Sequence, residues 1–255
     1  MTSPEVISSL TRVDIPTREG TAQVRALRPD GGVPREGTLL LGHGAGGHAD
    51  AADVLALTDL AGDGWTVVLV DQPWRVAGKK VATRPPTLDI AWRDIVGSLA
   101  DGDWQERHTL PLPRPWVYGG RSAGARVACR TSVDEQVDEQ VDEHGEARPG
   151  AAGVVCLAFP LHPPGKPERS RAHELALPVA AGLPTLVVQG RLDPFGSPAE
   201  IRAAVHGPSL TLQDVTGSHS PSRDLAAVRG HVADFLGTLT DARCDPIQKP
   251  RSTPR

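Results

Sequence analysis

The segment Trp116-Val-Tyr-Gly-Gly-Arg-Ser-Ala-Gly-Ala-Arg126 organises the interpretation of this 255-residue chain. Its apolar run, 116–118, predicts a buried strand, and residues 122–132 have the spacing of a helix. Between them, Gly120-Arg-Ser-Ala-Gly124 has the form G-x-S-x-G, which places a serine in a strained strand-to-helix turn where flanking side chains would clash. The amides at the start of the next helix stabilise negative charge that develops near this turn. Ser122 is therefore a candidate nucleophile.

Short apolar runs alternate with helical stretches on both sides of this segment. The runs that predict strands are 10–15, 22–27, 38–41, 66–70, 116–118, 153–157, 185–188 and 209–212. The stretches that predict helices are 51–61, 87–99, 122–132, 198–205 and 222–236. We expect the first two runs to pair in antiparallel fashion across a turn. The repeated alternation predicts an α/β fold with a mainly parallel, twisted sheet and helices on both faces.

The length of the chain fits one domain that buries roughly three quarters of its unfolded surface. We expect residues 1–240 to form this domain and the polar residues 241–255 to form a disordered tail. Residues 133–148 contain the tandem repeat VDEQ-VDEQ-VDEH. A four-residue period drifts around a helix, so we interpret this stretch as a solvated acidic insert, with an acidic docking segment as the alternative.

The charge and composition of the chain exclude several classes of partner. The formal charge is −4, but seven of the 31 acidic residues lie in 133–148, so the remaining chain is nearly neutral. Such a balance lacks the basic surplus of nucleic-acid-binding proteins. No apolar run approaches the roughly 18 residues of a membrane span, and the first 15 residues lack a secretory signal. Three cysteines without ligand-like spacing favour free thiols in the cytoplasm, and nothing indicates a metal or a cofactor.

A glycine-rich loop, His43-Gly-Ala-Gly-Gly47, follows the predicted strand 38–41. Backbone N–H groups in this position form an oxyanion hole together with the residue after a nucleophilic serine. We expect the amides of Ala45 and Ala123 to play this role, with Gly44 as a substitute for Ala45. His43 is expected to brace the loop by hydrogen bonding. A phosphate cradle is disfavoured, because no Lys-Ser or Lys-Thr pair follows the loop.

Two more residues complete a constellation at the ends of predicted strands. Asp193 follows strand 185–188, and His219 lies in a Gly/Ser loop after strand 209–212. Considered singly, Asp193 has the sequence context of a helix cap and His219 that of an ordinary loop residue. However, open α/β sheets bind ligands at the carboxyl edge of their strands, where Ser122 also lies. The three residues therefore predict a Ser-His-Asp triad.

Together these motifs resemble the α/β-hydrolase superfamily, which has the same Ser, Asp, His chain order. Within it, the chain is similar to a small, dienelactone-hydrolase-like branch akin to testis-expressed protein thirty and the third subunit of the NSL chromatin complex. The resemblance covers about residues 38–236, and its most branch-specific motif is Phe159-Pro-Leu-His-Pro-Pro-Gly-Lys166. It implies a compact fold with its serine nucleophile at Ser122. Ala123 stands where methionine is common in relatives, but either residue supplies the amide.

The size of the substrate follows from the connection between strands 153–157 and 185–188. Only 27 residues intervene, and many are prolines, so we expect little or no cap domain and a fairly open pocket. Small soluble esters or thioesters fit such a pocket. The candidate substrate-binding residues are Trp74, Arg75, Arg84, His162 and Lys166. The cationic members of this group would suit an anionic acyl group.

The sequence therefore predicts a serine hydrolase that cleaves carboxylic esters or thioesters through an acyl-enzyme on Ser122. One alternative is a catalytically idle hydrolase fold that serves as an interaction module, which the chromatin-complex relative and the acidic repeat motivate. An acyltransferase or peptidase is a further alternative. The expected partner is a small-molecule substrate, with no nucleic acid and no membrane, and the sequence identifies no protein partner.

Overall fold

The structure is a computed structural model that describes residues 10, 12–31, 33, 35–46, 50–133, 150–220 and 224–244. The acidic repeat expected within 133–148 lies outside these residues, apart from its first valine. Helix α9 (Leu225–Cys244) continues past residue 240, where the sequence suggested that the tail begins. The remainder of that tail, 245–255, lies outside the described residues.

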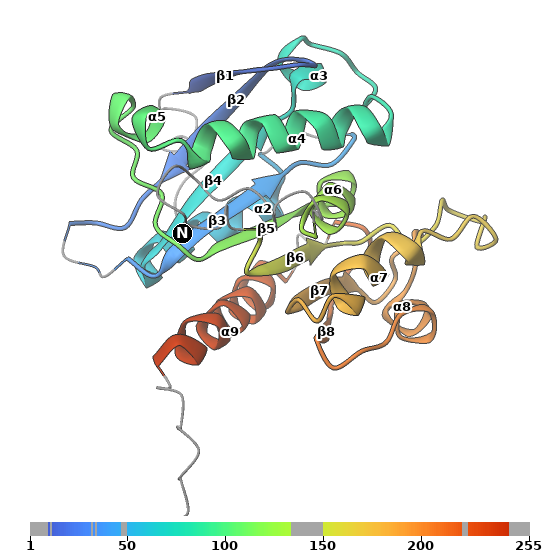
Figure 1. Ribbon diagram of the computed structural model, residues 1–255. Helices are drawn as coiled ribbons and strands as arrows, with labels where there is room; N and C mark the ends of the chain where they lie inside the picture. The colour runs from blue at the N-terminus through green and yellow to red at the C-terminus, as the bar shows by residue number, and fades with distance from the viewer. Residues whose placement is uncertain are drawn as a thin grey trace, which may run out of the picture.

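One twisted sheet contains the eight strands of the described residues (Figure 1). The strands are β1 (Val13–Thr17), β2 (Gly20–Leu27), β3 (Gly37–Gly42), β4 (Trp65–Asp71), β5 (Trp116–Arg121), β6 (Gly153–Leu157), β7 (Thr185–Gly190) and β8 (Leu210–Val215). They lie in the order β1-β2-β4-β3-β5-β6-β7-β8. β1 pairs with β2 in antiparallel fashion, as predicted, and β2 with β4 likewise, whereas the other pairs are parallel.

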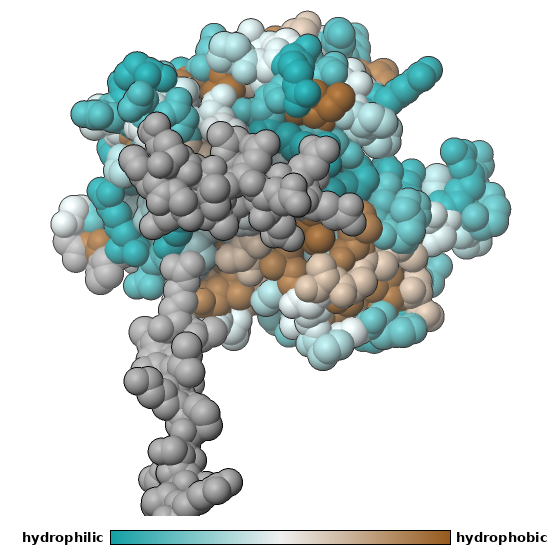
Figure 2. Space-filling model, in the orientation of Figure 1, coloured by the Kyte–Doolittle hydropathy of each residue, from teal (hydrophilic) through white to brown (hydrophobic). Residues whose placement is uncertain are grey.

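Helices cover both faces of this sheet. They are α2 (Ala52–Leu55), the 3₁₀ helix η1 (Ala56–Asp63), α3 (Pro73–Val76), α4 (Pro85–Ala100), α5 (Gly102–Arg107), α6 (Ala123–Thr131), α7 (Ala172–Ala180), α8 (Pro198–Ala204) and α9. In Figure 1, α4 and α6 lie on one side of the sheet and α9 on the other. The surface at α5 is mostly hydrophilic (Figure 2), as expected for a helix that turns its apolar side inward.

The core has two parts because successive strand residues point to opposite faces. In β3, Leu40 belongs to the cluster beneath α4, where it joins Trp92. Its neighbours Leu39 and Leu41 belong to the other cluster, which includes Val232 of α9. All six residues of β3 are buried, as are all seven of β4, and such strands can occur only inside a sheet with helices on both faces.

The chain between Leu55 and Trp65 differs from the prediction. A single helix was expected over 51–61, but α2 has only four residues and gives way to η1. The hydroxyl of Thr58 donates to the carbonyl oxygen of Leu55, 2.7 Å away, and this carbonyl is the one that residue 59 would use in an α-helix. The side chain thereby favours the tighter 3₁₀ winding.

The connection between β6 and β7 contains one helix, α7, which packs against α6 and forms no lid over the carboxyl edge of the sheet. The predicted fold class, a mainly parallel sheet with helices on both faces and no cap domain, is confirmed. Within the described part of the chain, no helix combines the length and apolar character that crossing a membrane requires.

Candidate active site

Ser122 occupies a strained turn between β5 and α6. Its backbone dihedrals are φ 53° and ψ −106°, values that side-chain-bearing residues rarely adopt. Close approach to the end of β3 explains the flanking glycines, because a Cβ on Gly120 would lie 2.6 Å from the carbonyl oxygen of Gly42. A Cβ on Gly124 would collide with the same oxygen. The backbone therefore requires glycine at positions 120 and 124, independently of any chemistry.

The three residues of the predicted triad lie in one hydrogen-bonded chain. The Oγ of Ser122 is 2.9 Å from Nε2 of His219. On the other side of the imidazole, Nδ1 is 2.8 Å from Oδ2 and 3.1 Å from Oδ1 of Asp193. With a proton on Nδ1, the imidazole accepts the hydroxyl proton of Ser122 at Nε2, which is the arrangement that a general base requires.

The carboxylate of Asp193 is held from several directions. Its side chain has no exposed surface. The N–H of Phe195 donates to Oδ1 over 2.9 Å, and Nε2 of Gln189 donates to Oδ2 over 2.8 Å. The Gln189 amide also donates to the carbonyl of Gly196, 2.8 Å away, so it is fixed to the turn that carries the aspartate. Gln189 had no predicted role, although a polar residue at the end of a fully buried strand was a signal for one.

The loop that carries His219 is attached to the end of β5, the strand that leads to Ser122. The Nη2 of Arg121 donates to the carbonyl oxygen of His219 over 2.8 Å and also to Oγ of Ser220. The Nε of the same guanidinium donates to Oδ2 of Asp53 in α2, 3.0 Å away. The ring of Phe195 lies against the imidazole of His219, with centroids 4.2 Å apart. Neither Arg121 nor Phe195 was singled out by the sequence, because their partners are distant along the chain.

The loop expected to supply the oxyanion hole lies beside the serine. A Cβ on Gly44 would be 3.5 Å from Cβ of Ser122, so the loop backbone passes directly over the turn that holds Ser122. His43 is buried, its Nδ1 lies 2.9 Å from the carbonyl oxygen of Gly44, and its Nε2 accepts from the N–H of Gln72 over 3.2 Å. These contacts are those of a bracing residue. Ala45 follows in an exposed turn, and Ala123 begins α6, where its N–H has no partner inside the helix.

An ion-pair network joins α6 to α7 and α4. Arg126 binds both carboxylate oxygens of Glu174 at 2.6 and 2.7 Å, and Arg130 joins Glu174 to Asp89 of α4. Burial by itself raises the pKa of Glu174, but hydrogen bonds and charge from the two arginines outweigh it, so its pKa lies below the ordinary value. Glu174 therefore stays ionised and links α7 to α6, the helix that follows Ser122.

The residues predicted to bind substrate lie at different places around the site. Trp74, in α3, is buried with its ring 5.3 Å from that of His43. His162 is also buried, and its Nε2 lies 3.2 Å from Glu200 of α8. The other three predicted residues are the half-buried Arg75 and the exposed Arg84 and Lys166. Their contact with substrate stays a prediction. In the described residues, no cluster of His, Cys, Asp and Glu has the arrangement of a metal site.

Comparisons with known proteins agree with the observed fold. A family model described as an alpha/beta hydrolase domain matches residues 35–226. No curated protein sequence matches the chain. A solved α/β serine hydrolase homologue from Coxiella burnetii is 18% identical, with a TM-score of 0.65 over 89% of this chain and 97% of its own.

Two further solved structures share the fold at low identity. Est1E from Butyrivibrio proteoclasticus is 13% identical, with a TM-score of 0.66 over 90% of this chain and 99% of its own. XC6422 from Xanthomonas campestris, an α/β serine hydrolase without a lid, is 18% identical, with a TM-score of 0.59 over 90% and 94%. Since the family model spans most of the sequence and the fold agrees, the chain belongs to the alpha/beta hydrolase domain family.

Proposed function

We propose that the protein is a serine hydrolase that cleaves small carboxylic esters or thioesters through an acyl-enzyme on Ser122. The observation that carries this proposal is the chain of contacts from Ser122 Oγ through His219 to Asp193, with distances of 2.9 and 2.8 Å. Acyl transfer needs a hydroxyl held at a strained turn, an imidazole within reach of that hydroxyl, and a buried carboxylate that hydrogen-bonds to the imidazole.

The reaction has two halves. In the first, Oγ of Ser122 attacks the carbonyl carbon while Nε2 of His219 takes the hydroxyl proton, and the N–H groups of Ala45 and Ala123 stabilise the oxyanion. The imidazolium then donates this proton to the leaving oxygen or sulfur as its bond to carbon breaks. In the second half, water gives a proton to His219 and attacks the ester carbon. Ser122 leaves with that proton, and the acid is released.

The open carboxyl edge supports the preference for small, soluble substrates. Residues 158–184 contain one helix, α7, and form no lid over the site, so no cap is present there to enclose a long lipid. A closer relationship to the branch of testis-expressed protein thirty remains part of the proposal. The proposal also places the enzyme in the cytoplasm, in keeping with the free thiols of Cys129 and Cys156.

A fluorophosphonate probe tests the nucleophile directly. We expect the intact mass to rise by one adduct, the label to map to Ser122, and p-nitrophenyl acetate to be hydrolysed. Ser122→Ala should abolish both signals. Ser209→Ala serves as the matched control, because that hydroxyl bonds only to the carbonyl of Val179 among described partners. A folded wild-type protein that neither labels nor hydrolyses esters would instead be an idle interaction module.

A further inference from the structure

The order of the strands assigns the two halves of an ester to opposite sides of Ser122. The nucleophile follows β5. Asp193 and His219 come after β7 and β8, which lie on one side of β5, whereas the segments after β3 and β4 lie on the other. His219 must reach the leaving atom to protonate it, so the leaving group belongs on the β7–β8 side. In a tetrahedral intermediate, the side toward β3 and β4 is then left for the oxyanion and the acyl substituent. This inference rests on the proposed acyl transfer.

A small cavity opens on that acyl side, directly beside Ala123. Part of its lining comes from residues with little or no side chain, namely Gly42, Ala123 and Gly124. The walls come from Leu88 and Trp92 of α4 and from Trp74 of α3, and all three side chains are buried. The volume is about 10 Å³, which is about the space that one water molecule needs. A methyl group fits there, but a longer chain does not.

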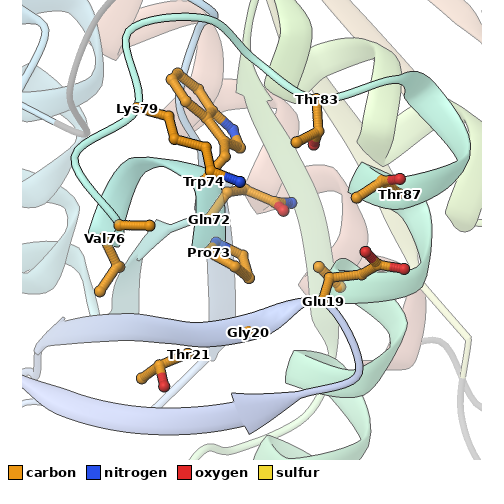
Figure 3. Close-up of a pocket in the computed structure, with 12 residues that line it drawn as sticks. Glu19, Gly20, Thr21, Gln72, Pro73, Trp74, Val76, Lys79, Thr83 and Thr87 are labelled. Carbon is orange, nitrogen blue, oxygen red and sulfur yellow. The ribbon is translucent and has the colours of Figure 1, made fainter.

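A second, larger cavity lies beyond the indole of Trp74. Its volume is about 360 Å³, and Trp74 and Gln72 line both cavities. Figure 3 shows the β1–β2 hairpin, with Glu19, Gly20 and Thr21, along one side of this outer cavity, and Trp74 on the other. The ring of Trp74 is held in place by packing on His43, with centroids 5.3 Å apart. Trp74 therefore stands between a methyl-sized space beside Ala123, the residue after Ser122, and a space large enough for a medium-length chain.

We propose that Trp74 determines acyl specificity by closing the acyl pocket at the size of an acetyl group. The substrate class is esters or thioesters of acetyl-sized acids with a variable leaving group. The leaving group is unrestricted by this pocket, because it extends toward the opposite, β7–β8 side of Ser122. Removal of the indole joins the two cavities, and the acyl chain then continues under the hairpin.

The experiment compares kcat/KM for p-nitrophenyl acetate, butyrate and octanoate. The wild-type enzyme should strongly prefer acetate. Trp74→Ala should raise the octanoate-to-acetate ratio by about tenfold or more, since discrimination of that size accompanies single changes in apolar pockets. We use the octanoate-to-acetate ratio of kcat/KM as the readout. The loss of packing between Trp74 and His43 should lower the rates for all three esters alike and so leave this ratio unchanged.

Val76 provides the matched control, because it lines the outer cavity alone. Val76→Trp should leave the wild-type ratio unchanged, since the outer cavity is not used there. In the Trp74→Ala background, the same substitution should cancel the gain on octanoate. Leu88→Ala widens the inner cavity without removing the indole and should raise turnover of butyrate but not of octanoate. It also tests the inference if Trp74→Ala fails to fold.

Two results would overturn the inference and leave the proposed function standing. One is a wild-type enzyme that hydrolyses octanoate as well as acetate. The other is a set of folded, labelled variants whose ratios all equal that of the wild type. A failure of the proposed function looks different, because the wild-type protein would then take no label at Ser122 and would hydrolyse none of the three esters.

Discussion

The guanidinium of Arg121 donates a hydrogen bond to the carbonyl oxygen of His219, 98 positions further along the chain, over 2.8 Å. The same side chain forms an ion pair with Asp53, whose carboxylate is almost fully buried. Because a Cβ on Gly44 would lie 3.0 Å from Nη1 of Arg121, the guanidinium also lies beside the oxyanion loop. Arg121, the residue just before Ser122, therefore joins the loop of His219 to α2, which follows the loop of Gly44.

Arg121 is expected to act as a positioning residue for His219. Arg121→Lys keeps the charge but cannot hold Asp53 and the His219 carbonyl together, so kcat should fall about 10- to 100-fold with little change in KM. The rate of fluorophosphonate labelling should fall in parallel, and added guanidinium should partly restore Arg121→Ala. Arg202→Ala, which removes an exposed pair with Asp214, is the control. An unchanged labelling rate in folded Arg121→Lys would contradict this role.

Asp193→Asn should lower kcat by about 10³- to 10⁴-fold, because the amide stabilises the wrong imidazole tautomer and cannot stabilise the imidazolium. Gln189→Leu should have a smaller effect, since the carboxylate keeps its bonds to Phe195 and His219. Steady-state kinetics on one ester, with circular dichroism as the check on folding, measures both. Equal losses in the two variants would show that Gln189 supports the turn as a whole rather than the carboxylate alone.

The stability of the protein should depend on pH through Glu174. Its pKa in the folded state is lowered by Arg126 and Arg130 despite the opposing effect of burial. The stabilisation is therefore complete above the pKa of the unfolded chain and is lost as the pH falls through the folded value. Glu174→Gln should reduce the free energy of unfolding by about 2 kcal/mol at pH 7. This loss is smaller than the loss on breaking a fully buried ion pair, because both arginines are partly exposed.

Urea denaturation at pH 7 and at acid pH measures this difference. The difference in free energy of unfolding between the wild type and Glu174→Gln should narrow as the pH falls below the pKa of an ordinary glutamate. Asp214→Asn breaks an exposed pair with Arg202 and should change stability less at every pH. A gap that stays constant with pH would mean that Glu174 contributes by packing rather than by charge.

The thiols of Cys129 and Cys156 should be inert in the native protein. Both are buried with their sulfur atoms 3.4 Å apart, and burial, followed by the contact with Cys156, raises the pKa of Cys129 well above its ordinary value. In a Cys244→Ser background, iodoacetamide at pH 8 should add nothing to the folded protein and two groups after unfolding in urea. Rapid modification of either thiol under native conditions would disprove this prediction.

The elements near the nucleophile could be predicted from local sequence alone. Residues 116–118 and 122–132 correspond to β5 and α6, and the glycines at 120 and 124 prove to be required by the closeness of Gly42. Apolar runs that are buried on both faces have a continuous pattern that periodicity detects. The split of 51–61 into α2 and η1 was missed, because it depends on one hydroxyl that bonds back to the carbonyl of Leu55.

The sequence by itself determined the strand–helix alternation, the turn that strains Ser122 and the chain order of the serine, aspartate and histidine, since each is written in short-range patterns of apolar, glycine and polar residues. Only the tertiary structure decided that β3 and β4 lie on one side of β5 and β7 and β8 on the other. That order depends on which strands pair, and it brings Arg121 to His219 and places Trp74 at the small cavity beside Ala123. Contacts of this kind join residues far apart in the chain, so no local pattern specifies them.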